Sequence, residues 1–108
     1  MEKKNIDWEN LSFAYMPVDK SFVSNYKDGA WDDGVLTSDH TITLNECAGV
    51  LQYAQTVFEG LKAYTTEDGH IVTFRPDLNA ERLQQSAARL EIPVVSTEKF
   101  LDALDQVV

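Results

Sequence analysis

The sequence has few basic residues and no long apolar run. Nine lysines and arginines stand against 18 aspartates and glutamates, which gives a formal net charge of −9. Apart from the pair Lys3 and Lys4 there is no basic cluster, so we expect no binding to nucleic acid. No segment reaches the roughly 18 consecutive apolar residues of a membrane helix, and the polar N-terminus is unlike a secretory signal. The sequence predicts a soluble, cytoplasmic protein without a membrane partner.

Cysteine and the common catalytic motifs are also scarce. Cys47 is the single cysteine, so an internal disulfide is excluded, and no set of ligand-type residues indicates a metal site. We expect Cys47 to be packed as a small apolar residue rather than to act as a reactive thiol. The chain has no Walker loop, dinucleotide motif or Ser-His-Asp set. His40 has no recognisable partner, and we expect His70 to be exposed in a turn.

The chain does have enough apolar residues for one core. They make up 44% of its 108 residues, and three prolines and five glycines form no linker, which predicts a single domain over residues 1–108. Hairpins are expected around the turns at Asp28-Gly29 and Asp68-Gly69, the second joining residues 57–66 to 71–75. The predicted class is α+β, with antiparallel hairpins forming a sheet and helices packed on one side.

Three helices are expected after the first hairpin. A short one begins near Asn45, a second begins at Pro76 and ends before Pro93, and a third is capped by Ser96. The period of the second helix predicts a buried face and an exposed face. The buried face comprises Leu78, Leu83, Ala87 and Leu90, and the exposed face comprises Glu81, Gln84, Gln85 and Arg89.

The stretch QYAQTVFEGLKAY, residues 52–64, combines apolar residues with polar ones that have no obvious partner. As a strand of period two, it would place Phe58, Gly60 and Lys62 on one face and Glu59 on the other. A glycine inside a strand marks either a close ligand or a bulge, and the residues alone leave both open. Lys62 by itself is typical of a solvated residue. We expect Glu59 to be structural, paired with an arginine or a backbone amide.

Arg82 is a second candidate, next to an apolar position of the predicted helix. Its planar donor fork suits a carboxylate or a phosphate. The pattern alone favours a surface ion pair instead, with Glu81 or with neighbours near Asp77.

Most of the chain resembles a known family. The run YAQTVFEGLKAYTTEDGHIVTFRPDLNAERLQQSAARLEIP, with IDWENLSFAYMP and YKDGAWDDGVLT before it, resembles the N-terminal region of branched-chain amino-acid aminotransferases. These are fold-type IV enzymes that use pyridoxal 5′-phosphate. The resemblance implies the small domain of a longer two-domain, homodimeric enzyme, in which leucine, isoleucine or valine passes its amino group to 2-oxoglutarate, giving glutamate.

The resemblance also assigns roles to individual residues. Arg82 matches the arginine that binds the cofactor phosphate. Phe58, Gly60 and Tyr53 match residues of the pocket for the aliphatic side chain, and Tyr53 with Lys62 is placed to help bind the distal carboxylate of glutamate. The cofactor would act as an electron sink that the protein orients.

Two departures from the family pattern bear on this site. Where the family commonly has Leu-His-Tyr-Gly-Gln, this chain has Leu-Gln-Tyr-Ala-Gln, with Gln52 in place of histidine and Ala54 in place of glycine. Ala54 would be strained if the turn needs a positive φ. The lysine that binds the cofactor covalently lies in a second, catalytic domain of the family, and no lysine here matches it. We therefore expect no catalytic residue in this chain and no activity from it alone.

Other functions remain open at this point. The chain ends inside an apolar helical stripe, which favours a domain cut from a longer protein. A stand-alone binding or assembly module with the same fold would instead use either the face of Phe58 and Gly60 or the open helical stripe to dock a partner. The small domain of another fold-type IV enzyme, a D-amino-acid transaminase or an aminodeoxychorismate lyase, is a nearer alternative.

Overall fold

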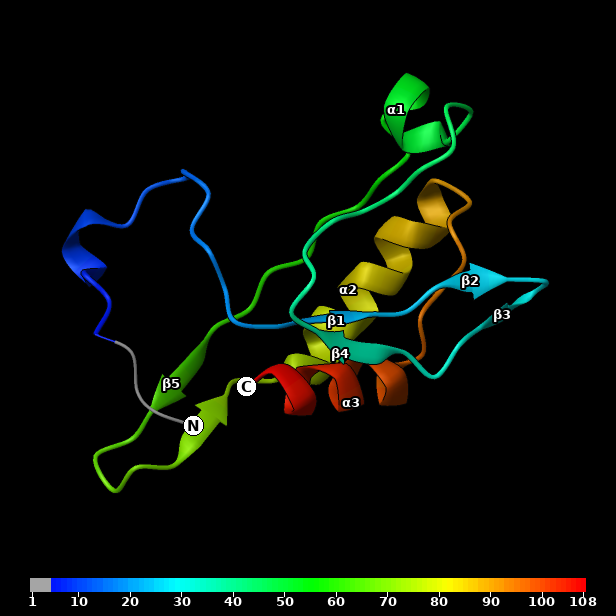
Figure 1. Ribbon diagram of the computed structural model, residues 1–108. Helices are drawn as coiled ribbons and strands as arrows, with labels where there is room; N and C mark the ends of the chain where they lie inside the picture. The colour runs from blue at the N-terminus through cyan, green and yellow to red at the C-terminus, as the bar shows by residue number, and fades with distance from the viewer. Residues whose placement is uncertain (1–4) are drawn as a thin grey trace.

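The computed structural model describes residues 5–108, so the basic pair Lys3 and Lys4 lies outside the described residues. One 3-10 helix, six short strands and three α-helices follow one another along this part of the chain (Figure 1). In order they are η1 Trp8–Asn10, β1 Ser21–Val23, β2 Tyr26–Lys27, β3 Ala30–Trp31, β4 Val35–Thr37, α1 Gly49–Tyr53, β5 Ala63–Thr65, β6 Ile71–Thr73, α2 Pro76–Arg89 and α3 Thr97–Val107.

The strands form three antiparallel pairs, β1 with β4, β2 with β3 and β5 with β6. The predicted α+β class is confirmed. Between β2 and β3 the chain turns at Asp28 and Gly29, with φ of 53° and 85°. Two successive positive φ values are typical of a two-residue hairpin loop, which explains why Asp-Gly marked this turn correctly.

The second hairpin is confirmed, but its strands are shorter than predicted. Gly69 has φ of 87° in the turn, and the Thr66 amide donates to the His70 carbonyl at 2.8 Å. Residues 57–62 form no strand. The pairing of β5 with β6 ends because Arg75, with φ of 45°, turns the chain from β6 into α2. No strand is then left to pair with residues 57–62.

The helix ends follow local sequence signals, with one shift. Pro76 is the first residue of α2, and the Ser96 side chain accepts a hydrogen bond from the Lys99 amide at 3.2 Å, as the cap of α3. The short helix α1 begins at Gly49, so the prediction that it begins near Asn45 is wrong. The Asn45 side chain accepts from the Cys47 amide at 2.8 Å, and this turn competes with helix.

Helices α2 and α3 pack against each other, and β1 of the β1–β4 pair contacts α3, while α1 and the β5–β6 hairpin project in different directions (Figure 1). The helix α2 buries Ala80 and Ala87, which are 1% and 3% exposed. Small side chains at these positions let neighbouring elements approach the helix closely.

Part of the predicted apolar face of α2 is wrong. Ala87 is buried and Leu83 is half-buried, but Leu78 and Leu90 are 47% and 41% exposed. The expectation that Gln84 is exposed is also wrong. Its amide donates to the Val95 carbonyl at 3.0 Å and to the Thr97 hydroxyl at 3.1 Å, so it ties α2 to the segment that enters α3.

Two other expectations concern isolated side chains. Cys47 is exposed, so the prediction that it packs as a small apolar residue is wrong, because residues 45–47 form a surface turn. His40, for which the sequence indicated no partner, lies 2.9 Å from the Ser21 hydroxyl through its Nδ1.

None of the helices in residues 5–108 has the length and apolar character that crossing a membrane requires.

Candidate functional site

The centre of the candidate site is an ion pair between α2 and residue 59. Arg82 donates from Nε to Oε2 of Glu59 at 2.8 Å and from Nη2 to Oε1. The Glu59 side chain is only 5% exposed, whereas that of Arg82 is 66% exposed. One edge of the guanidinium is therefore held against the protein while the rest of the group faces outward.

Further donors converge on the same carboxylate. The Asn79 amide donates to Glu59 Oε1 at 2.9 Å and also to the Gly60 carbonyl at 3.1 Å. The Gly60 amide donates to Glu59 Oε1 at 3.1 Å. The hydrogen bonds from Arg82, and secondarily that from Asn79, lower the pKa of Glu59 from 4.5 to about 2. Glu59 is thus held as an anion, which confirms its structural pairing with an arginine.

The partner expected for Arg82 from sequence pattern was wrong. Asp77 pairs instead with Arg75, whose Nε and Nη2 donate to the carboxylate at 2.9 and 2.7 Å. Arg82 lies five positions after Asp77, and this spacing corresponds to about 140° around an α-helix. The two side chains therefore leave α2 in different directions, and Arg82 meets the segment before β5.

The segment that carries Glu59 keeps the predicted alternation although it is not a strand. Val57, Glu59 and Leu61 are half-buried, while Phe58 and Gly60 are exposed. Phe58, at 90% exposure, presents almost its whole side chain on the outer face.

The surroundings of Gly60 bear on one of the two interpretations left open above, that of a crowded or strained site. A Cβ added at Gly60 would meet only the Phe58 ring, at 3.4 and 3.5 Å, which is ordinary contact. Gly60 is also not among the residues with positive φ. Crowding and backbone strain therefore do not explain this glycine in the described structure, and a Cβ there would rest against the Phe58 ring.

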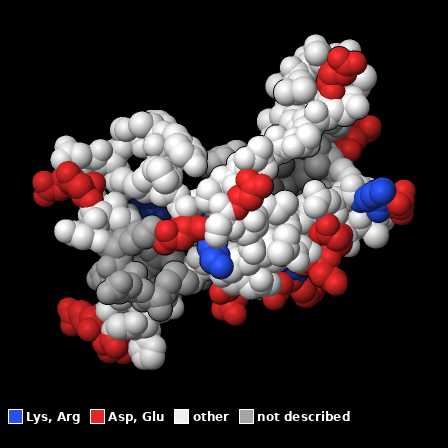
Figure 2. All heavy atoms as spheres, in the orientation of Figure 1, with Lys and Arg blue, Asp and Glu red and all other residues white. Residues whose placement is uncertain are grey.

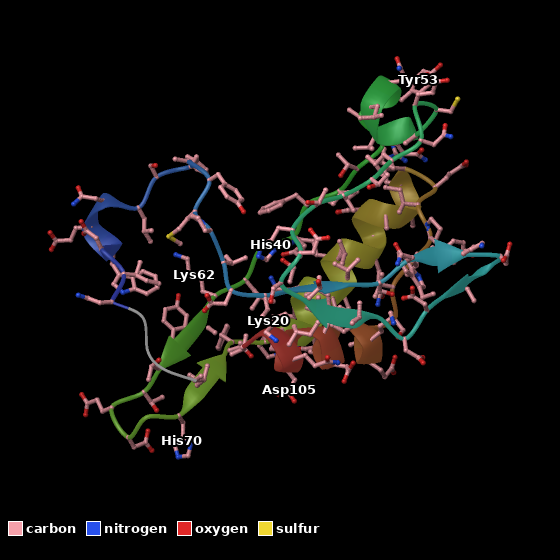
Figure 3. The ribbon with its side chains drawn as sticks, in the orientation of Figure 1. Lys20, His40, Tyr53, Lys62, His70 and Asp105 are labelled. Atoms are coloured by element: carbon pink, nitrogen blue, oxygen red, sulfur yellow. The ribbon has the colours of Figure 1, made fainter. Side chains whose placement is uncertain are left out.

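The remaining candidate residues lie far from one another. Tyr53 is at the tip of α1, and Lys62 lies on the opposite side of the molecule, just before β5 (Figure 3). Tyr53 is 86% exposed. The described chain therefore brings together Glu59, Gly60 and Arg82, with Phe58 beside them, but it does not bring Tyr53 and Lys62 into one pocket.

Ala54 ends α1 with φ of 49°. This is the left-handed conformation that glycine adopts more readily than alanine, so the condition under which strain was expected at Ala54 is met. Gln55, the next residue, donates from its side chain to the Leu90 carbonyl at 2.9 Å. That hydrogen bond links the base of α1 to the end of α2.

Sequence reasoning assigned no role to Asn79. It lies in the first turns of α2 and links two consecutive residues of the outer segment. An asparagine inside a helix is an indication that its side chain has a specific partner, because it otherwise weakens the helix.

Surface hollows and charge do not mark the site. Hollows of 440, 470 and 560 Å³ are lined by other residues, the largest by residues 16–20 and the end of α3 among others. On the face shown in Figure 2, acidic side chains are scattered over the surface and basic ones are few. An anion would be recognised here by the directed donors of Arg82 rather than by a general positive field.

Comparison with known proteins gives a direct relationship. No protein-family model matches the chain. It is 50% identical over 105 residues to a branched-chain-amino-acid aminotransferase of Haemophilus influenzae and 47% identical over 105 residues to one of Helicobacter pylori. A methionine aminotransferase of Arabidopsis thaliana is 44% identical over 104 residues.

These matches cover 97%, 97% and 95% of this chain, but only 31%, 31% and 29% of the relatives. The chain thus spans less than a third of the length of the curated relatives it matches. The resemblance drawn from the sequence is confirmed, since the chain is similar over almost its whole length to part of the branched-chain-amino-acid aminotransferases.

Proposed function

We propose that the chain is the N-terminal small domain of a branched-chain amino-acid aminotransferase that uses pyridoxal 5′-phosphate. The whole enzyme would transfer the amino group of leucine, isoleucine or valine to 2-oxoglutarate. The observation that carries this proposal is the 50% identity along 97% of the chain to an aminotransferase of that name. A cytoplasmic homodimer is part of the proposal.

The geometry of Arg82 fits a phosphate. An arginine has five N–H donors, and Glu59 accepts from one on Nε and one on Nη2. Among residues 5–108 no acceptor meets Nη1, and the side chain is 66% exposed. Three N–H groups are thus available to the phosphate oxygens of the cofactor, with which guanidinium groups form strong paired hydrogen bonds.

The other residues would serve the substrate. Phe58 and the side-chain-free Gly60 next to it would form an apolar wall for a branched aliphatic side chain, whose removal from water is favourable. Tyr53 and Lys62 would provide polar contacts to the distal carboxylate of glutamate. Because they lie on separate parts of this chain (Figure 3), we propose that each reaches the substrate from a different wall of the complete site.

The chemistry would be shared with the rest of the enzyme. When bound, the cofactor supplies the electron sink. This chain would anchor the phosphate and shape the pocket, while the lysine that holds the cofactor covalently would belong to the remaining part of the longer protein. The chain alone is expected to be inactive.

The test is an assay of the longer protein that contains this chain. Incubated with leucine, 2-oxoglutarate and pyridoxal 5′-phosphate, it should form glutamate, and residues 1–108 alone should not. A longer protein that forms no glutamate from leucine, isoleucine or valine would contradict the proposal. Activity with D-alanine but not with L-leucine would identify the alternative D-amino-acid transaminase.

A further inference from the structure

The hydrogen bonds of the Arg82 guanidinium divide it into two edges. The edge formed by Nε and Nη2 is occupied by the carboxylate of Glu59, whose side chain is 5% exposed. The edge formed by Nη1 and the second hydrogen of Nη2 faces outward. Two hydrogen bonds to one carboxylate fix both the position and the plane of a guanidinium, which a single contact does not.

Glu59 is itself held in place by the main chain and by α2. Asn79 donates to Glu59 Oε1 and to the Gly60 carbonyl, and the Gly60 amide donates to the same carboxylate oxygen. These contacts fix the carboxylate relative to both the outer segment and the helix. The orientation of Arg82 is thus set by a group that is itself oriented.

We propose that Glu59 is a positioning residue, which holds Arg82 by one edge so that the other edge is presented to the cofactor phosphate. This inference rests on the proposed phosphate-binding role of Arg82. Glu59 touches neither the phosphate nor the substrate in this account. It acts through the direction of the arginine donors, in the way that partners of a binding residue commonly orient it.

The charge of Glu59 distinguishes a positioning role from a purely electrostatic one, because the two predict opposite effects on phosphate affinity when the charge is removed. A carboxylate next to an anion site repels the anion, so Glu59 would weaken phosphate binding if Arg82 acted only as a point of positive charge. Removing that charge would then strengthen binding. Under the proposal the loss of orientation outweighs the loss of repulsion, and removal of the charge weakens binding.

The experiment compares Glu59→Gln with the unchanged longer protein, by titration with pyridoxal 5′-phosphate and with pyridoxal, which has no phosphate. The glutamine amide group cannot accept both arginine hydrogen bonds. Affinity for pyridoxal 5′-phosphate should fall by about tenfold, the order of one charge-assisted hydrogen bond. Affinity for pyridoxal should not change.

Two further variants isolate the path through Arg82. In an Arg82→Met background, Glu59→Gln should have no additional effect on the affinity for pyridoxal 5′-phosphate, since residues that act through one another are not additive. Asp77→Asn removes the carboxylate of the neighbouring ion pair and serves as the matched control. It should leave both affinities unchanged.

Two controls distinguish a loss of positioning from poor folding of the Glu59→Gln variant. Circular dichroism checks folding, and Glu59→Asp keeps the charge while withdrawing the carboxylate by one methylene. It should show a smaller loss of affinity, again confined to the phosphorylated ligand.

The outcomes separate the two proposals. If Arg82→Met leaves the affinity for pyridoxal 5′-phosphate unchanged, the phosphate role of Arg82 fails, and the role of Glu59 fails with it. If Arg82→Met weakens binding but Glu59→Gln strengthens it, leaves it unchanged, or weakens pyridoxal equally, only the positioning role is overturned.

Discussion

Two arginine–carboxylate pairs involve α2, one at its start and one near its middle, and they differ in sequence separation and in exposure. Arg75 and Asp77 are two residues apart, and their side chains are 56% and 40% exposed. Arg82 and Glu59 are 23 residues apart, and the Glu59 side chain is 5% exposed. The first pair lies within the turn that leads into α2. The second joins α2 to the segment around Glu59, and the β5–β6 hairpin lies between the two in the sequence.

The difference shows when an ion pair matters to a fold. An exposed local pair is screened by salt and water and has little effect on stability. A shielded carboxylate depends on its donors, because removing one partner leaves polar groups unpaired. The Glu59 pair should therefore respond to mutation, pH and salt unlike the Arg75 pair.

The largest expected effect comes from the packing that brings α2 close to its neighbours. Ala80, which is 1% exposed, lies between Asn79 and Arg82 on α2. Overpacking by Ala80→Leu should destabilise the protein by about 1–3 kcal/mol and displace Arg82 from Glu59. The Arg75 pair should survive, since it is confined to residues 75–77.

Urea denaturation measures this loss, and an NMR titration of the Glu59 carboxyl reports its pKa, which should rise from about 2 towards 4.5. Gln85→Leu is the matched control, because Gln85 is exposed on the same helix. Equal stability of the two variants would show that packing at Ala80 does not support the pair.

Removing each carboxylate compares the pairs directly. Glu59→Ala deprives Arg82, Asn79 and the Gly60 amide of their shared acceptor. It should lower the melting temperature by several degrees, whereas Asp77→Ala should lower it far less. Thermal denaturation at neutral pH checks this order, and equal decreases would remove the distinction between the two pairs.

Acid should affect the Glu59 pair over a defined range. Since the pKa of Glu59 is lowered from 4.5 to about 2 in the folded protein, its contribution to stability is complete above about 4.5 and is lost as the pH falls towards about 2. Glu59→Gln should therefore flatten the acid part of the stability curve. The pKa of Asp77 is also lowered, chiefly by hydrogen bonds from Arg75, and Asp77→Asn should flatten the curve less.

Melting temperatures between pH 7 and pH 2 would give both curves. If Glu59→Gln and the unchanged protein lose stability in parallel below about pH 4.5, then Glu59 is not the ionised, paired group described here.

The smallest expected effect concerns salt. At about 1 M ionic strength the screening length falls to about 3 Å, so the small destabilisation by Asp77→Asn should disappear. The destabilisation by Glu59→Gln should persist, because Glu59 is shielded from solvent. Melting temperatures at low and high sodium chloride concentration test this. If the destabilisation by Glu59→Gln also vanished at high salt, the Glu59 pair would be screened in the same way as the exposed Asp77 pair.

Local features of the fold were predictable, and long-range ones were not. The Asp28-Gly29 turn and the Ser96 cap follow from the backbone preferences of a few adjacent residues. The strand expected over residues 57–62 was wrong because a strand needs a partner, and no local signal shows where the partner ends. Gln84 was misjudged because its acceptors lie in the next connection along the chain.

By itself, the sequence determined the α+β class, the hairpin turns, the starts of α2 and α3, and the alternation that places Glu59 and Phe58 on opposite faces. These features depend on backbone dihedrals and side-chain period, which short segments specify. Only the tertiary structure decided that Arg82 pairs with Glu59 and that Asn79 joins them. The physical reason is that the direction in which Asn79 and Arg82 leave α2 selects Glu59 as their partner. Glu59 belongs to a segment about 20 residues earlier in the chain, and only the folded structure brings it within hydrogen-bonding distance.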